Sequence, residues 1–275
     1  MKRTCIWLLA AALVSTTALA GPDKVFIKQV NCDKGQSLDR AIESAGRGSS
    51  QLDVYVRGTC DETVTILRSR VWIYGVDDAV IDGRVRVFEA SNIRFFNIAI
   101  TGSGSGLVVS GGADVIADNL TLFGNEGENL RLARNSSAWL RESTIAGNCN
   151  DIYDEDCADG VSVSASVLTV RNSTISGNRY GITADNASTI SLLDTQIVNN
   201  SVVGVQAALQ SNVDLIGGTG FNGNRYHSLY LLQGSVARIS SPEVHVGGNI
   251  GCQDWRSYIA NPGGGYIGST WCEIL

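Results

Sequence analysis

A repeat of about 23 residues fills the second half of the chain and restricts its fold more than any other feature. Successive units open on Gly106, Asn129, Gly160, Gly181, Gly204 and Ser228. The intervals between these positions are 23, 31, 21, 23 and 24 residues. Each unit holds three short runs in which apolar and polar residues alternate, and a period of two is typical of β-strands. Three strands in so short a repeat indicate one coil of a parallel β-solenoid, because a propeller blade needs about 40 residues.

The same pattern continues less regularly toward the N-terminus. Strands are expected at Val64–Ile66, Val71–Tyr74, Val80–Asp82, Val85–Phe88 and Ile93–Ile100. They add about three coils, which brings the expected total to about 8–9. An asparagine ends each regular unit, and stacked amides are expected to hydrogen-bond from coil to coil. These residues are Asn125, Asn148, Asn178, Asn199, Asn224 and Asn249.

Both ends of a solenoid must be covered. Helical spacing over Ser37–Ala45, with Ser37 as the N-cap, predicts a capping helix. Arg40 stands where a capping box would place Glu. The predicted organisation is an N-terminal cap over residues 21–62, a β-helix over 63–250 and a C-terminal cap over 251–275.

The first residues have the features of a secretory signal. Lys2 and Arg3 precede an apolar run, and Ala18-Leu19-Ala20 forms a small-x-small cleavage site. Residues 1–20 are therefore expected to be removed, leaving an exported protein that is periplasmic or extracellular. The run is too short for a membrane span, which needs roughly 20 residues.

Six cysteines follow the predicted signal, and an even number in an exported chain indicates disulfides. Their clustering in the sequence favours the pairs Cys32–Cys60, Cys149–Cys157 and Cys252–Cys272, out of 15 possible pairings. Composition agrees with many short strands and tight turns, because the chain has 31 Gly, 3 Pro and only 17% charged residues. A net charge of −6 argues against a nucleic-acid partner.

The arrangement resembles the right-handed parallel β-helix proteins of the pectate lyase-like superfamily. The resemblance rests on Ser37–Ala45 followed by strands, on Val71–Gly75, on Ser91–Ile98 and on the repeated Asn-Ser-Thr-Ile with its terminal Asn. It implies an all-β, single-domain, right-handed parallel β-helix. It also implies that carbohydrate or polysaccharide binds on the outer face of one strand column and its loops.

Mapped onto this sequence, the outward position of the opening strand gives Val108, Arg131, Ser162, Thr183, Gln206 and Tyr230. The preceding turns add Arg179 and Tyr180, then Arg225, Tyr226 and His227. Asn-Arg-Tyr occurs at 178–180 and again at 224–226, two coils apart. Its Tyr rings suit stacking on sugars and its Arg side chains suit carboxylate or hydroxyl groups. The alternative is simple repeat duplication, with the aromatic rings covering turn backbone.

The 31-residue unit contains an inserted loop between Cys149 and Cys157, and five carboxylates lie between Asp151 and Asp159. Insertions in a solenoid become loops on one face, often the binding face. Asp154, Asp156 and Asp159 have the oxygen density that Ca²⁺ prefers, although the spacing departs from an EF-hand. A solvated acidic loop and a general acid are the other two interpretations.

Catalysis has weaker support in the sequence. The Arg-x-Pro-x-x-Arg stretch of lyases with this fold is absent, and so are the Asn-Thr-Asp and Gly-His-Gly elements of its hydrolases. His227, Arg179 and Asp159 are the candidate catalytic residues, and His227 has a purely structural role as its alternative. Three functions remain open: non-catalytic carbohydrate binding, a diverged polysaccharide lyase or glycoside hydrolase, and a structural or adhesive surface protein.

Overall fold

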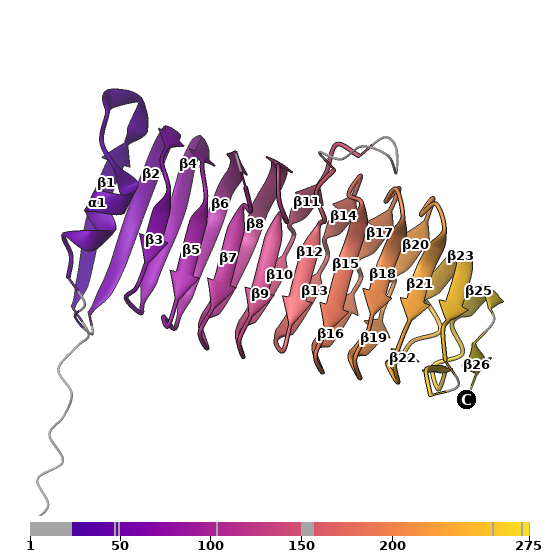
Figure 1. The fold of residues 1–275 in the computed structure, drawn as a ribbon. Coiled ribbons are helices and arrows are strands. Elements are labelled where there is room, and N and C mark those ends of the chain that lie inside the picture. The colour runs from indigo at the N-terminus through magenta and orange to yellow at the C-terminus, as the bar shows by residue number, and fades with distance from the viewer. Residues whose placement is uncertain are drawn as a thin grey trace, which may run out of the picture.

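The chain winds into one long stack of parallel strands in a computed structural model (Figure 1). The structure describes residues 24–46, 48, 50–102, 104–149, 157–254, 256–270 and 272–274. The predicted signal peptide, residues 1–20, lies outside this part of the chain. The fold is the all-β parallel solenoid that the repeat predicted, with about 10 turns rather than 8–9.

Three faces run the length of the solenoid, and we name them by the order of their strands within a repeat. The opening strands are β3 (Val64–Ile66), β5 (Val85–Phe88), β7 (Leu107–Ser110), β9 (Leu130–Ala133), β12 (Val161–Ser164), β15 (Tyr180–Asp185), β18 (Val203–Ala207) and β21 (His227–Leu231). The middle strands are β1 (Val25–Asn31), β10 (Ser137–Arg141), β13 (Val167–Arg171), β16 (Thr189–Leu193), β19 (Asn212–Ile216), β22 (Val236–Ile239), β24 (Tyr258–Ala260) and β26 (Glu273–Ile274).

The closing strands are β11 (Thr144–Ala146), β14 (Thr174–Ser176), β17 (Gln196–Val198) and β20 (Gly220–Asn222). Longer strands bend from the middle face into the closing face: β2 (Gln51–Asp61), β4 (Val71–Asp82), β6 (Ile93–Gly102) and β8 (Asp114–Asn125). At the C-terminal end, β23 (His245–Cys252) and β25 (Tyr266–Thr270) run from the closing face toward the opening face.

The core is a set of apolar columns, one residue per coil. On the opening face, Leu107 pairs with Leu130, which pairs in turn with Val161. These three side chains are fully buried, and their neighbours one residue along, such as Arg131, point outward. The alternation of apolar and polar residues therefore separates core from surface, as predicted from the sequence. Inward side chains stack on one another from coil to coil, and outward side chains form parallel columns on the surface.

A short helix covers the N-terminal end, as expected. Helix α1 spans Leu38–Glu43 after a 3₁₀ turn, η1 (Cys32–Lys34), and the Ser37 side chain accepts the Arg40 N–H. A capping box would place a Glu at position 40, where this chain has Arg. Glu62 supplies the carboxylate instead and accepts hydrogen bonds from the Leu38 N–H and the Ser37 hydroxyl, both at 2.6 Å. Neither helix in the described residues has the length and apolar character of a membrane-crossing segment.

Three disulfides join the cysteines in the expected pairs, Cys32–Cys60, Cys149–Cys157 and Cys252–Cys272. The first ties η1 to β2 beside the helix. The second joins the two ends of the inserted loop, and the third ties β23 to the end of the described chain.

Buried asparagines form a hydrogen-bonded ladder through the rim between the closing and opening strands. The amides connect Asn125 to Asn129 at 2.7 Å, Asn129 to Asn178 at 3.0 Å, Asn178 to Asn200 at 3.2 Å and Asn200 to Asn224 at 2.9 Å. Three expected members were therefore wrong. Asn129 takes the place of Asn148 and Asn200 that of Asn199, whose own backbone is left-handed (φ 55°). The Asn249 amide instead donates to the Tyr226 carbonyl.

Candidate functional site

The opening face presents one continuous column of outward side chains. The parallel register pairs Val108 with Arg131, then continues through Ser162, Thr183, Gln206 and Tyr230. Arg131 is exposed and the four residues after it are half-buried. The residues that the repeat placed at equivalent positions therefore lie in one line, with neighbouring coils about 4.8 Å apart.

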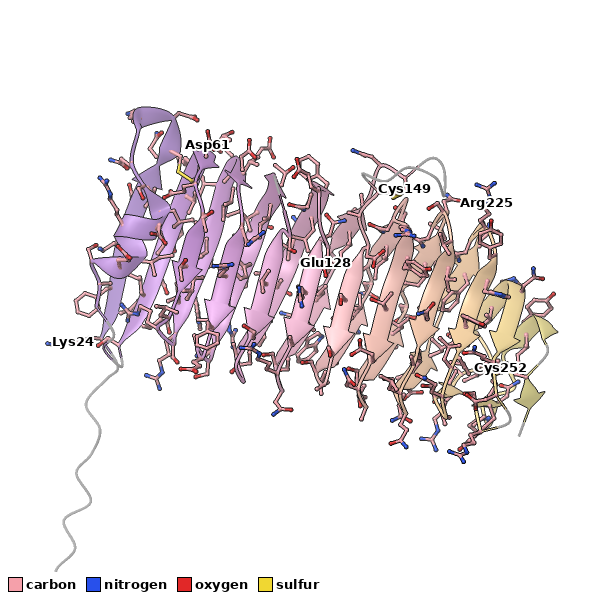
Figure 2. The ribbon with its side chains drawn as sticks, viewed as in Figure 1. Lys24, Asp61, Glu128, Cys149, Arg225 and Cys252 are labelled. Atoms are coloured by element: carbon pink, nitrogen blue, oxygen red, sulfur yellow. A yellow bond between two sulfur atoms is a disulfide. The ribbon has the colours of Figure 1, made fainter. Side chains whose placement is uncertain are left out.

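A second column lies beside the first, in the turns that lead into the opening strands. Two residues before the paired core positions it contains Ser105, Glu128, Asp159, Tyr180, the buried Val203 and His227. Ser105 Oγ donates to Glu128 Oε2 at 2.7 Å, and Arg131 Nη1 lies 3.8 Å from Glu128 Oε1. Figure 2 labels Glu128 on this face, midway along the solenoid. The two columns together form a polar strip that we call the opening strip.

Glu128 and Asp159 form a pair of carboxyl groups on adjacent coils. Burial raises the pKa of the Asp159 carboxyl above its ordinary value, and the negative charge of Glu128 acts in the same direction. The Tyr180 backbone N–H and the Arg179 charge lower the pKa of Asp159 but do not reverse the shift. One carboxyl thus holds its proton to a higher pH than usual, a condition typical of paired acids with different roles.

The two Asn-Arg-Tyr segments are not equivalent in space. Tyr180 pairs through Val203 with His227. Tyr226 therefore falls in the column of Arg179, two coils away with Val202 between them, and not in the column of Tyr180. The reason is one extra residue between the ladder asparagine and the opening strand in the later coils. Each Arg lies over its own Tyr, at 5.7 Å for Arg179 and 5.9 Å for Arg225. Tyr226 is 46% exposed and Tyr180 is half-buried, so the rings form two separate contact points.

His227 is packed against a neighbour rather than free in solvent. Its ring stacks on Tyr230 with centroids 4.8 Å apart, and its buried Nδ1 has no hydrogen-bond partner among the described residues. Burial lowers the pKa of His227. Gly251 makes room for both rings, because a Cβ there would lie 2.9 Å from Tyr230 Cδ2. The Tyr230 ring thus holds the His227 imidazole in place, and a catalytic role for His227 stays a prediction.

The proposed residues thus fall into two groups along the strip. Arg131 lies beside Glu128, and Asp159 is influenced by both Glu128 and Arg179. A second group, further along the strip beyond Gln206, consists of Arg225, Tyr226, His227 and Tyr230. In Figure 2, Cys149 at the base of the inserted loop and Arg225 both lie on the upper rim.

Comparison with known proteins supports the fold directly. Pectate lyase Pel9A superposes with a TM-score of 0.57 at 13% identity, covering 92% of this chain and 77% of that one. Tailspike protein 2 of Escherichia coli O157:H7 bacteriophage CAB120 superposes with a TM-score of 0.55 at 13% identity, covering 78% of this chain and 36% of the tailspike. The chain is a parallel β-helix. No protein-family model and no curated protein sequence matches it.

Of the predicted calcium ligands of this β-helix, Asp154 and Asp156 lie outside the described residues. Asp159 is described, and its carboxylate already accepts the Tyr180 N–H. Within the described part of the chain, Cys32, Cys60 and Glu62 have side-chain atoms close enough to share a metal, but both thiols are consumed by their disulfide. Calcium binding by the acidic loop therefore stays a prediction.

Two features of the β-helix were missed from the sequence. The first is Glu128. Its spacing of three residues from Arg131 could have indicated an ion pair between the two side chains. The other is an aromatic stack on the middle face, where Tyr55 lies 4.9 Å from Tyr74 and Tyr74 lies 4.7 Å from Phe96. The rings are nearly parallel, at 13° and 8°, so each inner face is covered by the next ring.

Proposed function

We propose that this protein is exported and binds a polysaccharide along the opening strip. The observation that carries the proposal is the uninterrupted register of outward polar side chains from Arg131 to Tyr230, flanked by the Glu128–Asp159 pair. A strip of side chains that repeats once per coil suits a polymer of repeating sugar units, because successive sugar units can contact similar side chains on successive coils. The disulfides are consistent with an exported chain.

The two groups on the strip supply different contacts. Arg131 and Arg179 present donors that match carboxylate or hydroxyl oxygens, and the Glu128 carboxylate accepts hydrogen bonds from hydroxyl groups. Tyr226, nearly half exposed, offers a ring edge and face at the far end. The fold neighbours agree in kind, since one is a pectate lyase.

The test is polymer binding by affinity electrophoresis against a panel of uronate and neutral polysaccharides. The double variant Arg131→Gln, Arg179→Gln is expected to bind at least about tenfold more weakly, as expected for lost charge-assisted bonds. Arg171→Gln is the matched control, because Arg171 is an exposed arginine on the middle face. Equal binding by the double variant and the wild type would exclude the opening strip.

A second function, glycoside hydrolysis, is favoured by one observation. Asp159 is shifted toward its protonated form beside Glu128, so the pair could divide the work of general acid and general base. In this reaction the acid protonates the leaving oxygen as the glycosidic bond breaks, while the base removes a proton from the attacking water. Release of reducing ends that is lost in Asp159→Asn with polymer binding retained, and lost also in Glu128→Gln, whose amide oxygen still accepts hydrogen bonds, would support it.

A lyase is tested in the same panel by adding Ca²⁺ and following the absorbance of unsaturated products. Silence in both assays together with retained binding identifies a non-catalytic binding protein. If no polymer binds at all, the polysaccharide proposal fails and a protein partner for this surface becomes the better explanation.

A further inference from the structure

A separate polar cavity lies at the N-terminal end, away from the opening strip. Its volume is about 630 Å³, and it opens between the cap and the rim where the middle face turns into the closing face. The side chains that matter here are Gln29, Asn31, Lys34, Gln36, Tyr55 and Arg57. In Figure 2 this end of the solenoid carries the label Asp61, beside the Cys32–Cys60 disulfide.

Tyr55 gives the cavity an aromatic wall. One face of its ring is covered by Tyr74 on the next coil, and Tyr55 is the first ring of the stack. On the other side its register partner is Gln29, which lines the cavity together with Tyr55. Gln29 therefore lies along the cap-facing side of the ring, and the part of Tyr55 that stays exposed, 36% of its surface, faces the cavity. The stack behind it holds the Tyr55 ring in place.

The cavity also has two cations. Lys34 makes no hydrogen bond or ion pair with any described residue. Arg57 meets Asp77 at 3.5 Å, with both side chains mostly exposed, and such surface pairs are weak enough to exchange partners. Two cationic side chains at one mouth favour an anionic group, most simply a carboxylate.

Amide groups complete the lining. Gln36 uses its Oε1 to accept the Asn31 N–H at 2.7 Å, which leaves its NH₂ as a donor. Asn31 Oδ1 is buried and accepts no hydrogen bond from the described residues. An unpaired buried acceptor is costly, and a hydroxyl donor brought in by a ligand, after a small rotation of the amide, would remove that cost. Amide groups both donate and accept hydrogen bonds, which matches the hydroxyl groups of a sugar better than a simple anion that only accepts.

We propose that this cavity binds one acidic sugar, with the sugar ring against the exposed part of Tyr55, the carboxylate between Lys34 and Arg57, and the hydroxyls on the amides of Gln29, Asn31 and Gln36. The disulfide and the left-handed Gly35 after η1 fix the loop that carries Lys34 and Gln36. The site goes beyond the proposed function, since it is built from the cap and does not depend on a polymer lying on the opening strip.

The experiment is an NMR titration of the full chain with D-galacturonate, following the side-chain amide signals of Gln29 and Gln36. D-Galactose, which lacks the carboxylate, tests whether the carboxylate is needed for binding. Acetate, which lacks the sugar ring, tests whether the ring is needed. Saturable shifts with galacturonate, at a Kd at least about tenfold lower than for either control compound, support the proposal. Equal affinity for galactose or for acetate would overturn it, as would the absence of shifts.

Variants separate the groups. Lys34→Gln is expected to weaken galacturonate binding about tenfold, whereas Lys24→Gln, at the opposite end of β1, leaves it unchanged. Tyr55→Phe keeps the ring and binds as the wild type does, and Tyr55→Leu loses binding. Lys34→Gln retains polymer binding on the opening strip, and Arg131→Gln, Arg179→Gln retains galacturonate binding in the cavity. Failure of one site is therefore distinguishable from failure of the other.

Discussion

Glu128 and Asp159 occupy equivalent positions on neighbouring coils, each two residues before a core residue, and those core residues, Leu130 and Val161, pair in register. The 31-residue spacing between the two carboxyl groups conceals this relationship in the sequence. In the folded chain, burial and the Glu128 charge both raise the pKa of the Asp159 carboxyl.

The raised pKa of Asp159 predicts a specific loss of stability with rising pH. Above the ordinary pKa of 3.8, the folded state holds a proton that the unfolded chain has released. The free energy of unfolding therefore falls as pH rises from that value through the raised pKa. Asp159→Asn removes this loss and should be at least as stable as the wild type at neutral pH. Urea unfolding at several pH values measures it, with the exposed Asp78→Asn as control; an unchanged profile in Asp159→Asn would contradict the assignment.

His227 is expected to titrate below its ordinary value of 6.5, because burial disfavours its charged form. The unfolded chain then binds the extra proton first, so stability is lost as pH falls from 6.5 through the folded-state pKa. His227→Phe keeps a ring against Tyr230 and should remove this acid-side loss. The imidazole signals report the titration directly, and a midpoint for His227 at or above 6.5 would refute the prediction.

Asn178 lies in the middle of the amide ladder and is fully buried. Asn178→Ala removes the acceptor of the Asn129 amide, whereas Asn200 Oδ1 still accepts the backbone N–H of residue 178 at 3.1 Å. The expected cost is about 1–3 kcal/mol for the unsatisfied Asn129 donor. The midpoint of urea unfolding should fall accordingly. Asn222→Ala, at an exposed position on β20, is the control and should change the midpoint little. A similar effect from both variants would show that the ladder contributes no special stability.

The Cys252–Cys272 disulfide closes a segment of 20 residues at the C-terminal end. Replacing both cysteines with Ala should lower the free energy of unfolding by about 3 kcal/mol in the loop-entropy model. In a solenoid each coil contacts only its neighbours, so the loss should be local. Hydrogen exchange should accelerate at Ile259 and Ile267 while Leu107 and Leu130 stay protected. Uniform acceleration along the chain would contradict this.

The opening strands could be predicted because their signal is local. Alternation around Leu107, Leu130 and Val161 fixes which side chains point inward, and the register then aligns Arg131 with Gln206 and Tyr230. The cysteine pairs also follow from proximity in the sequence. These inferences require only a period of two and a nearly constant coil length.

The contacts that depend on the register between coils of unequal length could not be predicted from the sequence. Asn200 rather than Asn199 joins the ladder, and Tyr226 falls in the column of Arg179 rather than that of Tyr180, because turns differ by single residues. The Tyr55–Tyr74–Phe96 stack lies in long strands of the irregular first coils, where the sequence spacing gave no hint of alignment. Glu128 stands in a turn, where no periodicity marks which way a side chain points.

The inserted loop leaves the winding of the solenoid untouched. β9 and β12 pair directly across it, and Cys149 and Cys157 hold its two ends 5.2 Å apart at their Cα atoms. The length and composition between these cysteines are thus uncoupled from the coil geometry. A foreign peptide grafted between Cys149 and Cys157 would be displayed beside the Glu128–Asp159 pair without shifting the strands. Sequence changes at this position, whether natural or engineered, can therefore alter what the protein recognises and leave the fold intact.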